Sequence, residues 1–151
     1  MTRSGFTTIE LIIVVIMLGV IATIGFPRIR DAVEKQNRRS MRAALVTYVA
    51  TARGLAVARG CRSSLHFTAG SGSKVWVTTC AINGAGRDTV IRPVATEAQW
   101  GHRLLAGRDS IDYTARGLRQ SFERTVIKIR TKGDLDRDSV VVNELGKVVY
   151  P

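Results

Sequence analysis

The chain has 151 residues, 45% of them hydrophobic, and a formal net charge of +11. This length is enough for one small domain and an additional segment outside it, and leaves little room for a second domain. The only long apolar run lies in the first 26 residues, which argues against a protein with several membrane spans. The basic excess is greatest from Arg28 to Arg59, where eight basic residues face two acids. Such a stretch can meet anionic lipid, acidic partner subunits or nucleic acid, or can be a solvated helix face.

The first predicted element is an apolar helix near the N-terminus. Residues Leu11 to Phe26 carry no charge, but as a helix they cover only about 24 Å of a hydrocarbon core of about 30 Å. A helix that starts at Phe6 covers about 31 Å and does span the core. Glu10 then lies inside the span, where a lone carboxylate costs several kcal/mol. We therefore expect Glu10 to have a functional partner.

Cleavage between Gly5 and Phe6 would supply that partner. The new α-amine, with a reference pKa of about 7.7–8.0, would be cationic at neutral pH. It would lie one helical turn before Glu10 and could pair with it in the same chain or in a neighbouring copy. An ordinary secretory signal is the alternative, but the residues before Phe26 lack a clean Ala-x-Ala cleavage site.

The stretch Gly5-Phe6-Thr7-Thr8-Ile9-Glu10, followed by the apolar run and Pro27, resembles the class III signal of type IV pilins and type II secretion pseudopilins. The resemblance implies that residues 1–5 are a leader removed by a prepilin peptidase, which then methylates the amine of Phe6. It also implies that residues 6–26 form the transmembrane and assembly helix, with Glu10 setting subunit register. The expected location is the bacterial inner membrane, single-pass, with a periplasmic head, and a pseudopilus after assembly.

Residues 27–60 are predicted to continue the helix in amphipathic form. Leu45, Val49 and Ala52 recur at helical spacing on one stripe, together with Tyr48 and Leu55. Gly60 is a credible helix terminus.

The composition then becomes typical of strands. Arg62–Thr68 and Lys74–Cys80 flank Ala69-Gly-Ser-Gly72, which predicts a hairpin with a four-residue loop. That register places Leu65 opposite Trp76, on a core face with Phe67, and Cys61 opposite Cys80. It favours a cross-strand disulfide, with two separate buried thiols as the alternative.

Further strands are predicted in the rest of the chain, and residues 95–110 show no clear pattern. The expected strands are Thr89–Val94, with Pro93 indicating an edge, Ile111–Thr114, Thr125–Thr131, Asp138–Asn143 and Lys147–Tyr150. The fold class is therefore α+β, a long N-terminal helix packed on an antiparallel β-rich head formed by residues 61–151.

This layout, with Asp112-Tyr-Thr-Ala-Arg-Gly117 before the last strands and Gly146-Lys-Val-Val-Tyr150 at the end, resembles the GspH/FimT group of minor pseudopilins. The resemblance implies a structural subunit that supports protein export and binds other pseudopilins or minor pilins. A major pilin or a GspG-type major pseudopilin is the alternative within the superfamily.

The same resemblance also implies an alternative function, in which the chain is a FimT-type minor pilin that binds DNA during natural transformation. The candidate DNA contacts are five arginines that could neutralise phosphates: Arg103, Arg108, Arg116, Arg119 and Arg124. The Gly-Arg-x-Arg pattern of such relatives has only an out-of-order counterpart here, Arg116-Gly-Leu-Arg119.

We expect no enzymatic activity, no cofactor and no metal. His66 and His102 lack metal-like spacing with the cysteines or acids, and the serines have no evident partner base. Asp134-Leu-Asp-Arg-Asp138 imitates the opening of a calcium loop, but the later Gly and Glu of that loop are missing. We therefore interpret it as a polar turn.

Overall fold

A computed structural model describes residues 7–131, 133 and 135–149. The chain divides between Gln36 and Asn37 into two compact units. The dividing point lies inside the longest helix, α1 (Thr8–Ala58), so both units contain part of it. We call the unit that begins at Asn37 the head.

The first unit contains the apolar stretch of α1 and the charged residues that follow it, up to Gln36. Its large apolar side chains from Leu11 to Phe26, as far as they are described, are between 47% and 67% exposed. The helix continues through Pro27. By length and composition alone this helix could cross a membrane.

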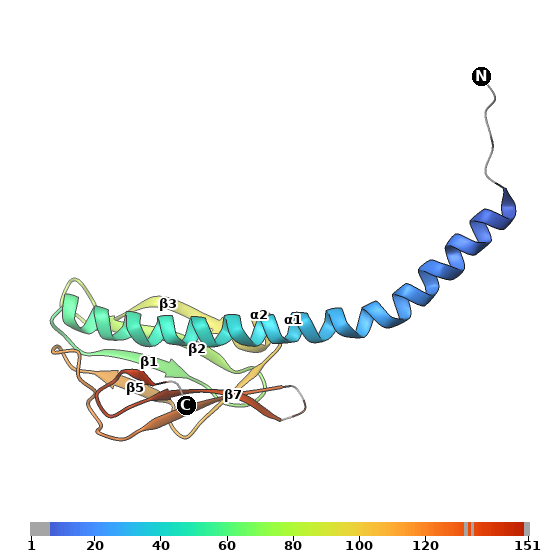
Figure 1. The fold of residues 1–151 in the computed structure, drawn as a ribbon. Coiled ribbons are helices and arrows are strands. Elements are labelled where there is room, and N and C mark those ends of the chain that lie inside the picture. The colour runs from blue at the N-terminus through green and yellow to red at the C-terminus, as the bar shows by residue number, and fades with distance from the viewer. Residues whose placement is uncertain (1–6, 132, 134, 150–151) are drawn as a thin grey trace. The chain divides into compact units, whose positions relative to one another are not determined.

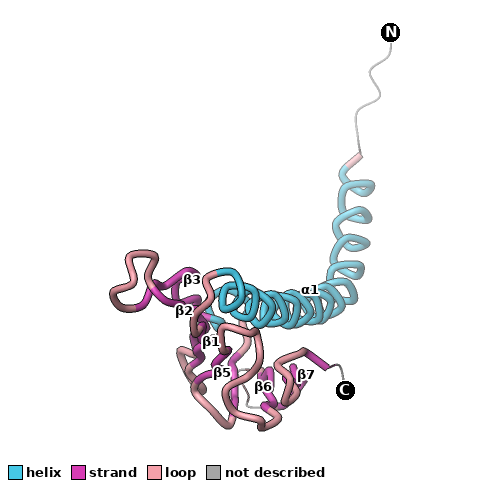
Figure 2. Tube along the Cα trace, turned by 90° about the vertical axis from the view of Figure 1, so that its left-hand side faces the viewer, coloured by secondary structure: helices cyan, strands magenta, loops and turns pink. Residues whose placement is uncertain are grey.

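The head combines the C-terminal part of α1 with a short helix and two antiparallel sheets (Figure 1). One sheet has the strand order β3-β2-β1-β5 and the other β4-β6-β7-β8. The elements are β1 (Ser63–Phe67), β2 (Lys74–Cys80), β3 (Arg87–Ala95), α2 (Thr96–Trp100), β4 (Arg103–Ala106), β5 (Ser110–Tyr113), β6 (Thr125–Arg130), β7 (Asp136–Val142) and β8 (Val148–Val149). Figure 2 shows that the strands lie along one side of this part of α1. The α+β class is thereby confirmed.

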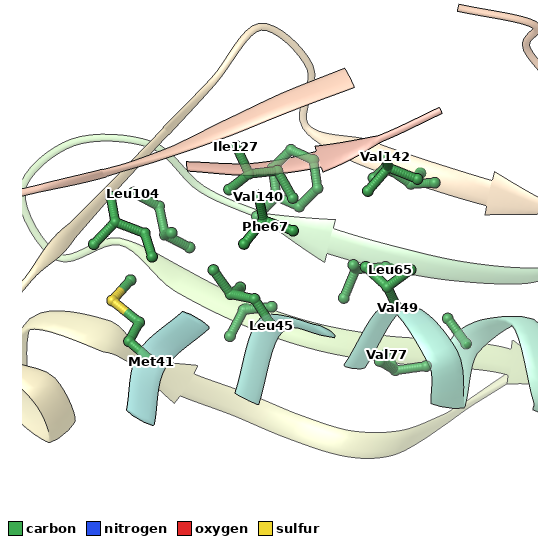
Figure 3. Close-up of a cluster of buried hydrophobic side chains, with 14 of the residues drawn as sticks. Met41, Leu45, Val49, Leu65, Phe67, Val77, Leu104, Ile127, Val140 and Val142 are labelled. Carbon is green, nitrogen blue, oxygen red and sulfur yellow. The ribbon is translucent and has the colours of Figure 1, made fainter. Parts of the chain in front are cut away.

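One hydrophobic core lies between the helix and both sheets (Figure 3). The helix contributes buried side chains three or four residues apart, namely Met41, Leu45, Val49, Ala52 and Ala56. The sheets contribute alternate residues such as Leu65, Phe67, Val75, Val77, Leu104, Ile127, Ile129, Val140 and Val142. The predicted helical stripe is thus the face that packs on the sheets.

The predicted register of the first hairpin was wrong by one residue. Leu65 pairs with Val77, and Trp76 pairs with His66. The amide of Thr68 donates to the carbonyl of Lys74 at 2.9 Å, so the connecting loop is one residue longer than predicted. Because side chains alternate along a strand, this slip moves Trp76 from the core to the outer face. There it stacks on His66 with ring centroids 5.1 Å apart.

The disulfide between Cys61 and Cys80 is confirmed, with Cα atoms 6.2 Å apart. Cys61 precedes β1, so its position does not follow the register of the strand pair. Pro93 does lie in an edge strand, because β3 borders only β2. The segment that gave no pattern contains α2 and β4, while β6 and β8 overlap the strands predicted near them.

Replacing both cysteines with serine should lower the free energy of unfolding of the head by about 3 kcal/mol. A crosslink between residues with a sequence separation of 19 lowers the entropy of the unfolded chain, and this raises the free energy of the unfolded state by roughly that amount. Chemical denaturation of the full chain in detergent, with and without a reductant, measures the loss. The reductant should shift the wild-type transition and leave that of the double-serine variant unchanged. A wild-type midpoint that does not move on reduction would contradict a stabilising bridge.

Candidate functional site

The start of α1 is built around Glu10. The amide and the hydroxyl of Thr7 each donate to Oε2 of Glu10 at 2.9 Å. The amide of Glu10 approaches the hydroxyl oxygen of Thr7 at 3.4 Å. This reciprocal pattern is a capping box, in which a Thr and a Glu three residues later satisfy free amides at a helix start. Glu10 therefore has a partner within its own chain.

The sequence contains the signal for this cap, Thr7-x-x-Glu10, but the partner expected for Glu10 was inferred from its charge alone. The cleavage bond between Gly5 and Phe6 and the methylated amine of Phe6 lie outside the described residues. Those two roles therefore remain predictions from the resemblance.

Arg119 occupies the interior of the head. Its side chain is 2% exposed, and its guanidinium donates to Oγ1 of Thr125 at 2.7 Å and to the carbonyl of Asn143 at 3.3 Å. It also donates to the carbonyl of Glu123. Burial lowers the pKa of this guanidinium. A DNA contact requires an exposed cation, which Arg119 does not present.

The other four arginines of the predicted DNA set differ in their surroundings. Arg103 pairs with Glu97 at 3.3 Å, and Arg108 pairs with Glu123. Arg116 and Arg124 are exposed. Only these last two have no carboxylate within ion-pair distance among the described residues.

A concave basic surface in the head was not predicted. It joins three arginines of α1, Arg38, Arg39 and Arg42, to Arg137 and Asp138 of β7, and Ala43, Val46 and Thr47 complete its lining. Its volume is about 600 Å³. We call this surface the arginine groove. The basic helical residues were visible in the sequence, but nothing local placed Arg137 beside them.

The outer face of the first sheet carries a serine, a histidine and an aspartate that resemble a hydrolytic set by residue type. The Ser64 hydroxyl, however, donates to Asp112, and Nε2 of His66 contacts the Thr78 hydroxyl at 2.8 Å. Ser64 is also fully buried. Burial raises the pKa of Asp112, but hydrogen bonds from Ser64 and Arg62 outweigh it, so the pKa is lowered overall. In a Ser-His-Asp triad the histidine takes the serine proton, whereas here Ser64 is hydrogen-bonded to Asp112 and His66 to Thr78.

Among the described residues, no group of three or more His, Cys, Asp or Glu side chains is placed to hold a metal ion. In the calcium-like stretch, Asp136 binds Lys128 at 2.7 Å and also Arg130, and Asp138 binds Arg42 at 3.2 Å. Asp134 lies outside the described residues. Strand β7 begins at Asp136, two residues before the strand predicted from Asp138, so the interpretation as a turn was wrong for Asp136 and Arg137.

No protein-family model matches the sequence, and no curated protein matches it either. The structure is similar to a crystal structure of the type IV minor pilin FimU of Pseudomonas aeruginosa (strain PAO1), with a TM-score of 0.58 and 16% identity. The match covers 78% of this chain and 90% of that pilin. A second crystal form of FimU gives a TM-score of 0.56 and 15% identity over 75% of this chain and 91% of the pilin. The fold of this chain is therefore the type IV pilin fold, as the sequence predicted.

Proposed function

We propose that the chain is a structural, non-enzymatic subunit of a type IV pilin-like filament. The observation that carries the proposal is the exposed apolar half of α1, from Leu11 to Phe26. A continuous apolar stretch of this size needs a covering, because soluble monomers rarely expose one. Lipid covers it before assembly, and the equivalent helices of neighbouring subunits cover it in the filament.

The filament has two candidate systems. A type II secretion pseudopilus, in which the chain is a minor pseudopilin that supports export, follows from the resemblance of the head to the GspH/FimT group. A type IV pilus is favoured by the likeness to FimU, which is described as a type IV minor pilin. Deletion of the gene separates them, because loss of secreted proteins and loss of surface pili are different phenotypes.

Processing of the N-terminus tests the shared part of the proposal. When the chain is produced in a cell with a prepilin peptidase, we expect residues 1–5 to be removed and Phe6 to become the N-methylated first residue. Gly5→Lys should leave the leader attached and remove the chain from the sheared filament fraction. Mass spectrometry of the N-terminal peptide measures both results. A wild-type chain that keeps its leader, or is cut near Phe26, would contradict the proposal.

DNA binding is the second candidate function, and the exposure of Arg116 and Arg124 favours it. If the chain binds DNA, duplex DNA should bind the full chain in detergent, and the affinity should fall steeply as the salt concentration rises. Changing both arginines to alanine should reduce the salt slope by about 2, which is about 1 per phosphate contact. Fluorescence anisotropy at several salt concentrations measures the slope. Absence of binding at low salt would remove this function.

A further inference from the structure

The arginine groove is formed by two neighbouring rows of helical residues and one strand. Arg38, Arg42 and Val46 are spaced four apart on α1, and Arg39, Ala43 and Thr47 form the adjacent row. Arg137 and Asp138 come from β7. The groove lies wholly within the head.

The groove has more positive charge than its own acid can neutralise. Asp138, whose side chain is 18% exposed, pairs with Arg42 and accepts the backbone amide of Ser139 at 2.8 Å. Among the described residues, no other carboxylate lies within ion-pair distance of the three remaining arginines, Arg38, Arg39 and Arg137. Like charges this close raise the free energy of the empty groove and favour an anionic occupant.

The lining also indicates which anion fits. Ala43 and Val46 add apolar surface to the same lining. A phosphate backbone would use the cations and leave this apolar surface in contact with water. An acidic peptide segment can complement both the charged and the apolar parts of the lining. Its carboxylates would pair with the arginines, and its neighbouring apolar side chains would cover Ala43 and Val46.

We propose that the arginine groove docks an acidic, partly apolar segment of a different filament subunit. A second copy of this chain is a poor occupant, because the sequence is strongly basic, with a net charge of +11 over its full length, and like charges suppress association. The inference rests on the proposed function and extends it. It makes the chain a subunit that enters a filament beside acidic partners and does not polymerise with itself.

A binding experiment with the full chain in a neutral detergent tests this proposal. The probe is a fluorescent peptide that alternates Glu and Leu, and the control peptide has Lys in place of Glu. The groove variant is Arg38→Glu with Arg137→Glu. The matched variant, Lys74→Glu with Arg92→Glu, makes the same change in net charge at basic residues that are exposed outside the groove.

We expect the acidic peptide to bind, and the groove variant to weaken its binding at least about tenfold. The matched variant should change the affinity by less than about twofold, as expected for charges outside the site. Both variants should unfold at the wild-type temperature, because none of the four replaced residues has an ion pair among the described residues. The Lys peptide should not bind.

Three outcomes would overturn the proposal. Equal losses in the two variants would mean that net charge, and not the groove, attracts the peptide. Groove-dependent binding of short duplex DNA, or of phosphatidylglycerol vesicles, without binding of the peptide would assign the groove to phosphates. Failure of peptide binding in a chain that is still cut after Gly5 and found in filaments would remove this inference and leave the proposed function intact.

Discussion

Replacing Arg119 with alanine should lower the free energy of unfolding of the head by about 3 kcal/mol, the range expected when buried, charge-assisted hydrogen bonds are lost. The guanidinium donates hydrogen bonds to the Thr125 hydroxyl and to the carbonyl groups of Glu123 and Asn143. Removing it leaves these acceptors without their donor in a place that water reaches poorly, since the side chain is 2% exposed. Chemical denaturation of the full chain in detergent, followed by tryptophan fluorescence, measures the change.

Two companion variants separate this effect from simple loss of charge. Arg116→Ala removes an exposed guanidinium three residues earlier and should change stability by less than about 0.5 kcal/mol. Arg119→Lys keeps the charge, but an ammonium group lacks the planar set of donors with which a guanidinium reaches several acceptors. We therefore expect an intermediate loss of unfolding free energy. Equal stability of the Arg119→Ala and Arg116→Ala variants would show that the buried network contributes nothing.

The surroundings of Arg119 explain why the C-terminal hairpin stays on the core. A Cβ on Gly146 would lie 2.5 Å from the Tyr113 ring and 3.0 Å from Cγ of Arg119, so only glycine allows this approach. The Tyr113 hydroxyl donates to the carbonyl of Gly146 at 3.2 Å. Burial raises the pKa of Tyr113 to about 12, which keeps the phenol protonated and able to donate at physiological pH.

Much of the fold could be predicted because its signals are local. The recurrence of Leu45, Val49 and Ala52 along the helix marks the core face, and the alternation in Thr125–Arg130 marks a central strand. The register of the first hairpin could not be predicted from the same signals. It depends on one residue of loop length, which the Gly-Ser-Gly sequence of the turn leaves open. The helix α2 has only five residues, too few for a period to show.

The candidate sites also divide into one with a local sequence signal and others that bring together residues far apart in the sequence. The motif around Glu10 occupies consecutive residues, so the sequence is sufficient to predict it. The arginine groove brings Arg137 next to Arg38 through packing of a strand against a helix. The burial of Arg119 is equally non-local, since its acceptors come from residues up to Asn143. In the sequence Arg119 looked like an exposed arginine, which is why it entered the predicted DNA surface.

Glu10 should be indispensable for assembly through its charge, and this can be tested apart from its role in the helix cap. Glu10→Gln retains an oxygen that can accept the Thr7 amide, so the capping box persists. The variant has no negative charge to pair with the N-terminal amine of a neighbouring filament subunit. We therefore expect incorporation into filaments to fall at least about tenfold, because an unmatched charge in an apolar filament core costs several kcal/mol. Immunoblots of the sheared filament and membrane fractions measure the ratio.

Thr7→Ala provides the converse change. It removes the hydroxyl that donates to Glu10 at 2.9 Å and leaves the carboxylate in place. Loss of the cap costs about 1 kcal/mol at the first turn of the helix, and the surrounding lipid limits its effect on the rest of the span. Incorporation of this variant should therefore stay within about twofold of wild type. If Thr7→Ala abolished assembly while Glu10→Gln assembled normally, Glu10 would act through the capping box, and the pairing of subunits through its charge would be wrong.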